Sequence, residues 1–421
     1  MKIFKFGGAS VKDAEAIKNV GSILLRYEHE DILVVVSAMG KTTNALEECL
    51  KHLIKRDELN FYHSVDSLVA FHEDIAGGLF HNRHNAVFQF IHDTFEFLKN
   101  KFDKPLAEDH AYEYDQIVSV GELLSSFIIN EYLLELGFKA EWLDARRLIR
   151  TDNHYREGNV NWEKTQELII NRIKPALSNS NTFITQGFIG HTSEGFTTTL
   201  GREGSDYSAA IFAFCLEASE VVIWKDVPGM LNADPKYFKN TQLLEEISYR
   251  EAIELAYFGA SVIHPKTIKP LQNKQIPLFV KSFVSPDAMG TKIQSKGTKD
   301  HLIPSFIVKK NQVLITINAA DFSFINEGSL AKIFKVFDDC RLKINLMQNS
   351  ALNFSVLVDG DSINLENLMV HLRPDFQCKY NENVELVTIR HYNTETCEQM
   401  TQGKEILLEQ RSRQTARFVI H

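Results

Sequence analysis

A strand–helix–strand unit interrupted by glycines opens the chain, and it constrains the fold more than any other feature. Residues 3–6 are apolar enough to form a short strand, and Gly7 and Gly8 end it. Residues 11–26 place apolar side chains at helical spacing, and Ile32–Val36 is a second, wholly aliphatic strand. Two short strands joined through a helix pair in parallel within one sheet. The sequence therefore predicts the beginning of an α/β sheet of mostly parallel strands.

Signals of the same kind continue along the chain. The pattern predicts strands at residues 182–188, 221–224 and 276–281, and helices at residues 207–216 and 249–257. Residues 43–98 are largely helical in pattern, and we expect them to cover the sheet as an insertion. Residues 285–304 are polar and punctuated by glycine and proline, which predicts a linker.

After this stretch the order of the predicted helices and strands changes. The pattern predicts helices at 329–337 and 363–372, and strands at 313–317, 342–346, 354–358 and 384–389. Two helices separated by paired strands are typical of one or two small ferredoxin-like βαββαβ modules. We therefore expect two domains, residues 1–298 and residues 299–421.

Composition excludes several classes of partner. Lys and Arg number 46 against 55 Asp and Glu, a net charge of −9, so nucleic acid and anionic membranes are not expected partners. The longest aliphatic run, Ile32–Val36, is far shorter than the roughly 20 residues of a membrane helix. Five scattered cysteines suit neither a disulfide framework nor a zinc site. With no apolar leader expected before Lys5, the predicted compartment is the cytoplasm.

Two loops that follow strands can receive an anion or a polar substrate. Gly7 and Gly8 let the backbone approach a ligand, and the helix that follows favours negative charge at its start. Lys5, on the preceding strand, can supply a point charge for a phosphate. A tight turn with a solvated lysine explains the same residues about equally well. The second loop, residues 37–44, offers hydroxyls and amides at a strand end, although a helix cap accounts for it more simply.

Three later stretches add candidate groups. Glu122 opens an apolar helix, where an acidic residue is usually a favourable dipole partner but could also bind an ammonium group. Arg202 offers a planar fork for a carboxylate within a glycine-rich loop, and Asp206 begins the next helix as either a cap or a functional group. Residues 224–236 follow a buried-looking strand and carry two turn signals, so they could line a nucleotide pocket.

Taken together and in this order, these stretches resemble the aspartate kinases of the amino-acid kinase family. The family's KFGGTSV is similar to residues 5–11, with Ala9 replacing threonine, and its TLGRGGSD to residues 199–206, with Glu203 replacing glycine. Its TDVPG and DPR are similar to residues 225–229 and 234–236, and its FGAKVLHP to residues 258–265. The chain beyond residue 300 resembles the tandem ACT regulatory modules of the same enzymes.

The resemblance implies an amino-acid kinase fold with ferredoxin-like ACT modules, and ATP-dependent phosphorylation of the β-carboxylate of L-aspartate. It implies that Lys5 and Asp206 are catalytic. The nucleotide would be bound by Lys5, Gly7, Gly8, Ser10, Lys225, Asp226, Leu231 and Lys236. Aspartate would be bound by Ser37, Thr43, Glu122, Arg202 and Ser205. Mg²⁺ would be carried on the phosphates, with no protein metal ligands.

Regulation by lysine or threonine is also implied, with effector contacts at Ser329, Leu330, Asn345 and Asn349. By the same resemblance we expect a homodimer formed through the ACT modules. Two alternatives remain open. One is a kinase of the same fold for another small acceptor, such as glutamate, acetylglutamate or a nucleoside monophosphate. The other is a non-catalytic amino-acid sensor, which is favoured by Glu203 and by Ser261, a position where the family has lysine.

Overall fold

The computed structural model describes residues 1–82, 85–260, 263–297, 300, 303–321 and 323–421. These residues form two compact units, each described here by itself. The first contains Met1–Met230, Leu243–Ile253 and Val262–Thr298, and the second Leu231–Gln242, Glu254–Ser261 and Lys299–His421. Two short segments that precede the expected boundary at residue 298 thus cluster with the second unit.

The first unit is built on an eight-stranded sheet in the order β3-β4-β2-β1-β7-β9-β10-β8. All neighbouring pairs are parallel except β9 and β10, so the expected mostly parallel sheet is confirmed. Its strands are β1 (Lys2–Phe6), β2 (Ile32–Val36), β3 (Ala140–Leu143), β4 (Thr182–Gln186), β7 (Glu220–Lys225), β8 (Glu246–Ser248), β9 (Leu278–Ser282) and β10 (Thr291–Gln294).

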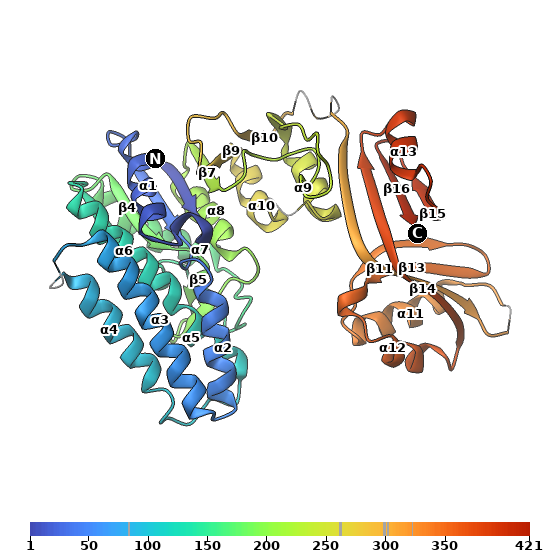
Figure 1. Cartoon of the computed structure of the whole chain (residues 1–421), viewed down its shortest axis with the longest axis horizontal. Helices are drawn as coiled ribbons and strands as arrows, with labels where there is room; N and C mark the ends of the chain where they lie inside the picture. Colours follow the sequence, from blue (N-terminus) through green and yellow to red (C-terminus); the bar gives the residue numbers. More distant parts are fainter. Residues whose placement is uncertain (83–84, 261–262, 298–299, 301–302, 322) are drawn as a thin grey trace. The chain divides into compact units, whose positions relative to one another are not determined.

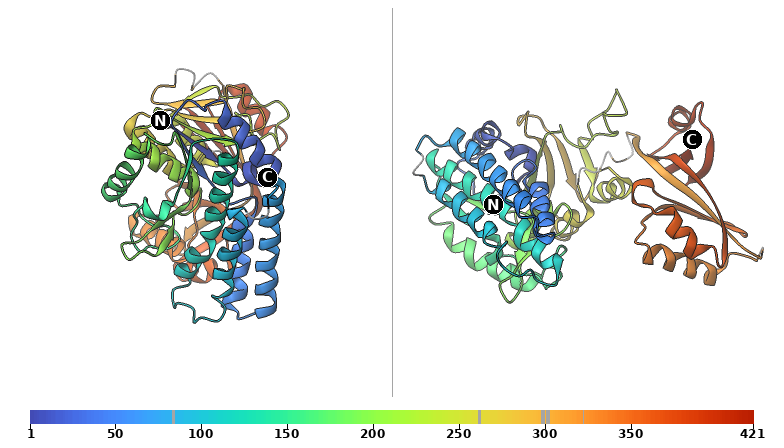
Figure 2. Two further views of the ribbon diagram at one scale, coloured as in Figure 1. Left: turned by 90° about the vertical axis from the view of Figure 1, so that its left-hand side faces the viewer. Right: turned by 60° about the horizontal axis from the view of Figure 1, so that its bottom comes forward.

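Helices cover both faces of this sheet (Figure 1). A layer that shares a core with Phe4 and Phe6 contains α1 (Ala14–Leu25), α2 (Thr42–Ile54), α3 (Glu58–Leu79), α4 (Ala86–Lys99), α5 (His110–Val118) and α6 (Val120–Glu135). The opposite layer contains α7 (Trp162–Ala176), α8 (Gly204–Leu216) and α10 (Pro265–Lys274), which pack on one another. The long helices α2 to α4 lie side by side, as expected for the helical insertion (Figures 1 and 2).

One helical segment, His110–Glu135, is long and apolar enough to cross a membrane. It corresponds to α5 and α6, and 78% of its most apolar window is buried inside the protein. Its apolar surface is therefore used in the core of the first unit, where Leu124, Ile128 and Leu133 are fully buried.

The expected linker at residues 285–304 was partly wrong. Within it, β10 pairs with β9 and with β8 and so extends the sheet. The reason is that contacts with β8 and β9, and not the local composition, make these residues a strand. Thr291 and Ile293 face the interior while Lys292 and Gln294 are half-buried, and the polar composition hides this short alternation. By contrast, Ile32–Val36 is a strand at the predicted residues, because all five side chains are buried.

The second unit is a six-stranded antiparallel sheet in the order β12-β13-β11-β14-β16-β15. Its strands are β11 (Ser305–Ala319), β12 (Ile344–Asn349), β13 (Asn353–Asp359), β14 (Phe376–Arg390), β15 (Ile406–Arg411) and β16 (Thr415–Ile420). Helices α11 (Glu327–Asp339) and α12 (Leu365–Leu372) pack on one half of the sheet, and α13 (Thr394–Thr401) packs on the other (Figure 1). The long strands β11 and β14 run through both halves, which matches the expected ferredoxin-like modules.

Candidate active site

Two glycine-containing loops meet at the carboxyl ends of the central strands. Because β1 and β2 are parallel neighbours, the turns that follow them lie side by side. The backbone N–H of Gly40 donates to the carbonyl oxygen of Gly8 at 3.0 Å. A Cβ at Gly8 would lie 2.8 Å from the Ala38 carbonyl oxygen, so only glycine allows this approach. The loop continues into the 3₁₀ helix η1 (Gly8–Val11), in which Ser10 is buried.

A buried ion pair joins Lys5 on β1 to Asp206 on α8. Side chains alternate along a strand, so while Phe4 and Phe6 enter the core beneath α1–α6, Lys5 points to the face covered by α8. Its Nζ lies 2.6 Å from Oδ1 of Asp206. Only 10% of the Lys5 side chain and 3% of the Asp206 side chain is exposed. The pair therefore lies where water screens it little.

Lys225, at the end of β7, is the second cation beside Asp206. Its Nζ lies 3.6 Å from Oδ2 of Asp206, and β7 is the parallel neighbour of β1. Burial alone would raise the pKa of the Asp206 carboxyl, but the charges of Lys5 and Lys225 outweigh burial and lower that pKa. A carboxylate with a lowered pKa thus lies beside two lysine side chains at the carboxyl end of the sheet.

The backbone at the start of α8 lies very close to the turn that follows β4. A Cβ at Gly187 would lie 2.5 Å from Cβ of Ser205, and a Cβ at Gly204 would lie 2.7 Å from the ring of Phe188. Glu203, the N-cap residue of α8, adopts left-handed backbone angles (φ 53°, ψ 29°). Glycine would take this conformation at less cost, so the carboxylate of Glu203 is held beside the helix start at the expense of backbone strain.

Glu122, in the first turn of α6, is a buried carboxylate with an unused acceptor. Oε1 accepts a hydrogen bond from the backbone N–H of Ala38 at 3.2 Å. Oε2 is buried and has no hydrogen-bond partner among the residues that the structure describes. Burial raises the pKa of the Glu122 carboxyl to about 8. The ionised form of Glu122 is therefore destabilised in the absence of a ligand, and a bound cationic group would stabilise it.

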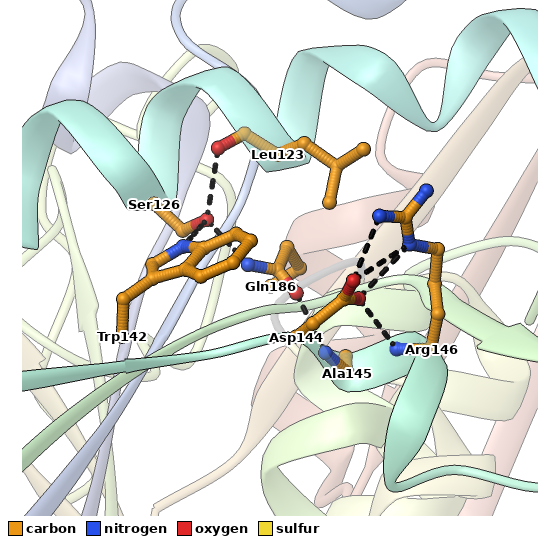
Figure 3. Close-up of polar contacts among 7 residues, drawn as sticks. All are labelled: Leu123, Ser126, Trp142, Asp144, Ala145, Arg146 and Gln186. Atoms are coloured by element: carbon orange, nitrogen blue, oxygen red, sulfur yellow. Dashed lines mark hydrogen bonds and ion pairs between the residues drawn. The ribbon is translucent and has the colours of Figure 1, made fainter. Parts of the chain in front are cut away.

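A polar network fixes the helix that carries Glu122 to the sheet (Figure 3). The Gln186 amide, at the end of β4, donates to Oγ of Ser126 at 2.6 Å and accepts from the Ala145 backbone N–H at 2.7 Å. The indole N–H of Trp142, on β3, also donates to Oγ of Ser126, at 2.9 Å. Ser126 lies one turn of α6 beyond Glu122, so the network holds that turn against two strand ends.

The first unit contains a cleft of about 720 Å³, which is within the usual size of a small-molecule site. The sequence-predicted residues that line it are Lys5, Ser37, Thr43, Glu122, Arg202, Ser205, Asp206 and Lys225. The lining residues that sequence reasoning missed are Tyr114, His154, Tyr155, Arg156, Glu157 and Phe188. Of the missed residues, Arg156 adds a second guanidinium, which lies over the ring of Tyr114 at 4.2 Å.

The other predicted nucleotide contacts are not among the residues that line this cleft. Gly7 and Ser10 lie in the turn after β1, and a Cβ at Gly7 would lie 3.4 Å from Nζ of Lys5. Asp226 is exposed directly after β7. Leu231 and Lys236 belong to the segment that clusters with the second unit. Ser261 lies outside the described residues.

The predicted effector contacts lie in the second unit, in two different environments. Ser329 and Leu330 are half-buried in the first turn of α11, where the Ser329 backbone N–H donates to the Asn326 side chain. Asn349 is exposed at the end of β12. Asn345 is only 8% exposed. Its Oδ1 accepts from Nζ of Lys309 at 2.9 Å, and its Nδ2 donates to the side chains at positions 312 and 359.

Comparison with known proteins places this chain in a family. The model of the amino acid kinase family matches residues 1–282. Lysine-sensitive aspartokinase 3 of Escherichia coli is 31% identical over 394 residues, covering 92% of this chain and 86% of that protein. The structure of E. coli aspartokinase III with aspartate and ADP, in the R-state, covers 100% of this chain and 96% of that one. Its TM-score is 0.80 at 27% identity.

A second structure of E. coli aspartokinase III, with lysine and aspartate in the T-state, has a TM-score of 0.81 at 27% identity. It covers 100% of this chain and 95% of that chain. The match extends through both units, so it includes the antiparallel sheet as well as the kinase part. The chain therefore belongs to the amino acid kinase family and, within that family, to the aspartokinases.

Proposed function

We propose that this protein transfers the γ-phosphoryl group of ATP to the β-carboxylate of L-aspartate, giving 4-phospho-L-aspartate and ADP. The observation that carries the proposal is the unpartnered, buried Oε2 of Glu122, which shares one cleft with Arg202 and with the Lys5–Asp206 pair. An ammonium group at Glu122 and an α-carboxylate at Arg202 leave a second carboxylate to approach Lys5. Aspartate has this set of charges.

The cleft suits phosphoryl transfer because the reaction needs charge stabilisation more than proton transfer. A β-carboxylate oxygen attacks the γ-phosphorus, forming the new O–P bond. The bond from phosphorus to the β–γ bridging oxygen breaks, and ADP leaves with its electron pair. The reference pKa of an aspartate carboxyl is about 3.9, so the nucleophile is already ionised and no general base is required. Lys5 lowers the repulsion between the two anions.

The nucleotide is expected along the turn after β1, with Gly7, Gly8 and Ser10 next to its phosphates. Lys225 would contact a phosphate, and Asp226, Leu231 and Lys236 are proposed to line the nucleotide further out. Mg²⁺ would neutralise negative charge on the phosphates. Asp206 is already paired with two lysines, which fits a metal carried by the nucleotide rather than by this carboxylate.

An acceptor panel tests the activity. Release of ADP is measured with L-aspartate, L-glutamate, N-acetylglutamate and UMP, with and without Mg²⁺, and the acyl phosphate is trapped with hydroxylamine. We expect hydroxamate formation with aspartate only. Turnover with another acceptor would reassign the substrate, and no turnover with any acceptor, although aspartate binds, would support a sensor.

Regulation is proposed to lie in residues 299–421, with residues 1–298 as the catalytic domain. The related E. coli enzyme is named as lysine-sensitive, and its T-state structure contains lysine. We expect lysine or threonine to inhibit, with Ser329, Leu330 and Asn349 as accessible contacts. Initial rates at subsaturating aspartate with millimolar lysine, threonine or both test this. We also propose a cytoplasmic homodimer joined through the ACT modules, which sedimentation with and without effector would test.

A further inference from the structure

Asp115 on α5 is a buried carboxylate that the proposed mechanism does not use. It is 0% exposed and does not line the cleft. Three donors converge on it. Oδ2 accepts from the backbone N–H of Arg156 at 2.9 Å and of Thr199 at 2.9 Å, and Oδ1 accepts from the Thr199 hydroxyl at 2.7 Å. All three donors are neutral groups, so the carboxylate serves as a hydrogen-bond acceptor rather than as half of an ion pair.

The donors come from two separate loops. Arg156 lies in the segment between η2 (Ala145–Arg147) and α7, with left-handed backbone (φ 69°). Thr199 ends β6 (Thr197–Thr199), which forms a two-stranded sheet with β5 (Ile189–His191). Asp115 thus accepts hydrogen bonds both from the edge of a small sheet and from a strained loop.

The neighbouring residue on α5 strengthens the hold on β6. The side-chain amide of Gln116 donates to the Thr197 carbonyl oxygen at 2.8 Å and accepts from the Thr197 N–H at 3.3 Å. The two loops also contact one another, because the Gly158 N–H donates to the Thr199 carbonyl oxygen at 2.9 Å. At the edge of β6 that faces away from β5, the side chains of Asp115 and Gln116 therefore make the hydrogen bonds that a neighbouring strand could make.

Both loops carry side chains of the cleft. The first loop contributes Arg156 and Glu157, and the second contributes Arg202 and, at the start of α8, Ser205. The distance along the chain from Thr199 to Arg202 is only three residues. A shift of β6 would therefore move the guanidinium proposed to bind the substrate carboxylate, and shifts of about 1 Å in a site can cost 100-fold in rate.

We infer that Asp115 is a positioning residue, which holds the loops of Arg156 and Arg202 in the arrangement that binds the α-carboxylate of aspartate. The inference rests on the proposed function. It assigns Asp115 a role through its hydrogen-bond geometry, since the donors to it among the described residues are neutral groups.

The test compares two substitutions at Asp115. Asp115→Ala removes all three acceptor contacts, and KM for aspartate should rise about tenfold while KM for ATP changes less than about twofold. Asp115→Asn can keep the contacts: its oxygen accepts both N–H groups and its amide donates to the Thr199 hydroxyl. It should therefore restore KM for aspartate to within about twofold of wild type.

Glu113 offers a matched control on the same helix. It is 4% exposed, and it accepts from Nζ of Lys101 at 2.7 Å and from the Ala107 N–H at 3.0 Å, away from both loops. Glu113→Ala should lower the melting temperature without a change in KM for aspartate. Equal effects of Asp115→Ala and Glu113→Ala on KM, an unchanged KM in Asp115→Ala, or a KM in Asp115→Asn as high as in Asp115→Ala, would each overturn the inference.

A second readout does not depend on activity. Hydrogen–deuterium exchange of residues 154–158 and 197–203 should be faster in Asp115→Ala than in wild type and Glu113→Ala. If Asp115→Ala does not fold, Thr199→Val removes only the hydroxyl donor and should speed exchange in the same segments. Unchanged exchange in the variant that folds contradicts positioning. If wild type lacks aspartate turnover but the exchange result holds, the proposed function fails and the positioning of the loops survives.

Discussion

Glu122 in the first unit and Asn345 in the second are both nearly fully buried polar side chains, at 3% and 8% exposure, but their polar atoms are used differently. Glu122 keeps one carboxylate oxygen without a partner among the described residues. Asn345 uses its oxygen for the Lys309 ammonium group and both amide hydrogens for Gln312 and Asp359. Two side chains that are buried to a similar extent therefore differ in whether their polar atoms have partners.

The difference lies in what each group would lose without a ligand. A buried carboxylate with an unmatched oxygen carries a cost of desolvation, and that cost is recovered when a cation binds. A saturated amide has no such cost, and a ligand would first have to break three existing contacts. The comparison predicts that substitutions in the cleft change substrate kinetics, whereas substitution of Asn345 changes stability.

The largest effect is expected from Lys5→Ala. The substitution removes the charge nearest the transferred group and, among the residues that the structure describes, leaves Asp206 with Lys225 as its one cationic partner. Loss of a preorganised electrostatic contact typically lowers kcat about 100- to 1,000-fold, or about 2.7–4 kcal/mol. Steady-state kinetics on protein shown to be folded by circular dichroism provide the measurement. A folded Lys5→Ala variant with near-normal kcat would remove Lys5 from the reaction.

The next effect is expected from Arg202→Ala. A bidentate guanidinium contact to a carboxylate is charge-assisted, so its loss should raise KM for aspartate about 10- to 100-fold, with a smaller change in KM for ATP. Arg202→Lys is the matched control, and it should recover only part of the loss because an ammonium cannot form the planar fork. Equal rises for both substrates would place Arg202 outside the carboxylate site.

The residues behind these two predictions could be selected from the sequence, and those around Asp115 could not. Lys5 lies near the end of a strand just before two glycines, Arg202 lies in a glycine-containing loop, and Asp206 is in the first turn of the helix that follows, so the local pattern marks all three positions. Arg156 enters the cleft through a left-handed turn fixed by a hydrogen bond to position 115, 41 residues earlier. A contact between residues so far apart produces no periodic pattern in the sequence.

The same physical reason explains the fold. Fully buried strands such as Ile32–Val36 were predicted at their true residues, because apolar runs specify burial directly. The strand at Thr291–Gln294 was missed, because its pairing with β9 and with the more distant β8 decides that it is a strand. The hydrogen bonds of the Asn345 side chain could not be predicted either, since its three side-chain partners lie 14 to 36 residues away.

A third prediction concerns pH and Glu122. The pKa of this carboxyl rises from 4.5 to about 8 on folding, so the folded state holds the proton more tightly than the unfolded state. The free energy of unfolding should therefore fall as pH rises between these two values. Glu122→Gln removes the titratable carboxyl group, so the stability of this variant relative to wild type should increase by about 2 kcal/mol between pH 6 and pH 8.

Denaturant unfolding of the ligand-free proteins at both pH values measures this change, and saturating aspartate provides the control. With aspartate bound, an ammonium group at Glu122 should lower the pKa of the carboxyl and reduce the pH dependence of wild type. A difference between the variants that stays constant from pH 6 to pH 8 would show that Glu122 does not titrate in this range.

The smallest effect is expected from Asn345→Ala. The substitution leaves the Lys309 ammonium group and the polar groups at positions 312 and 359 without their shared partner, and it should lower the stability of the second unit by about 1 kcal/mol. Because these contacts are internal, kcat, KM for aspartate and the response to lysine or threonine should not change. Differential scanning calorimetry and inhibition curves measure the two properties separately.

Asn349→Ala, four residues along the same strand, makes the opposite prediction and completes the comparison. Asn349 is exposed, so its loss should leave the melting temperature unchanged. If Asn349 contacts the effector, half-maximal inhibition in this variant should require a higher effector concentration. The reverse pattern, with Asn345→Ala losing inhibition at an unchanged melting temperature, would mean that an effector displaces Lys309 from Asn345. The contrast with Glu122 would then disappear, because a saturated amide would have served as a ligand site.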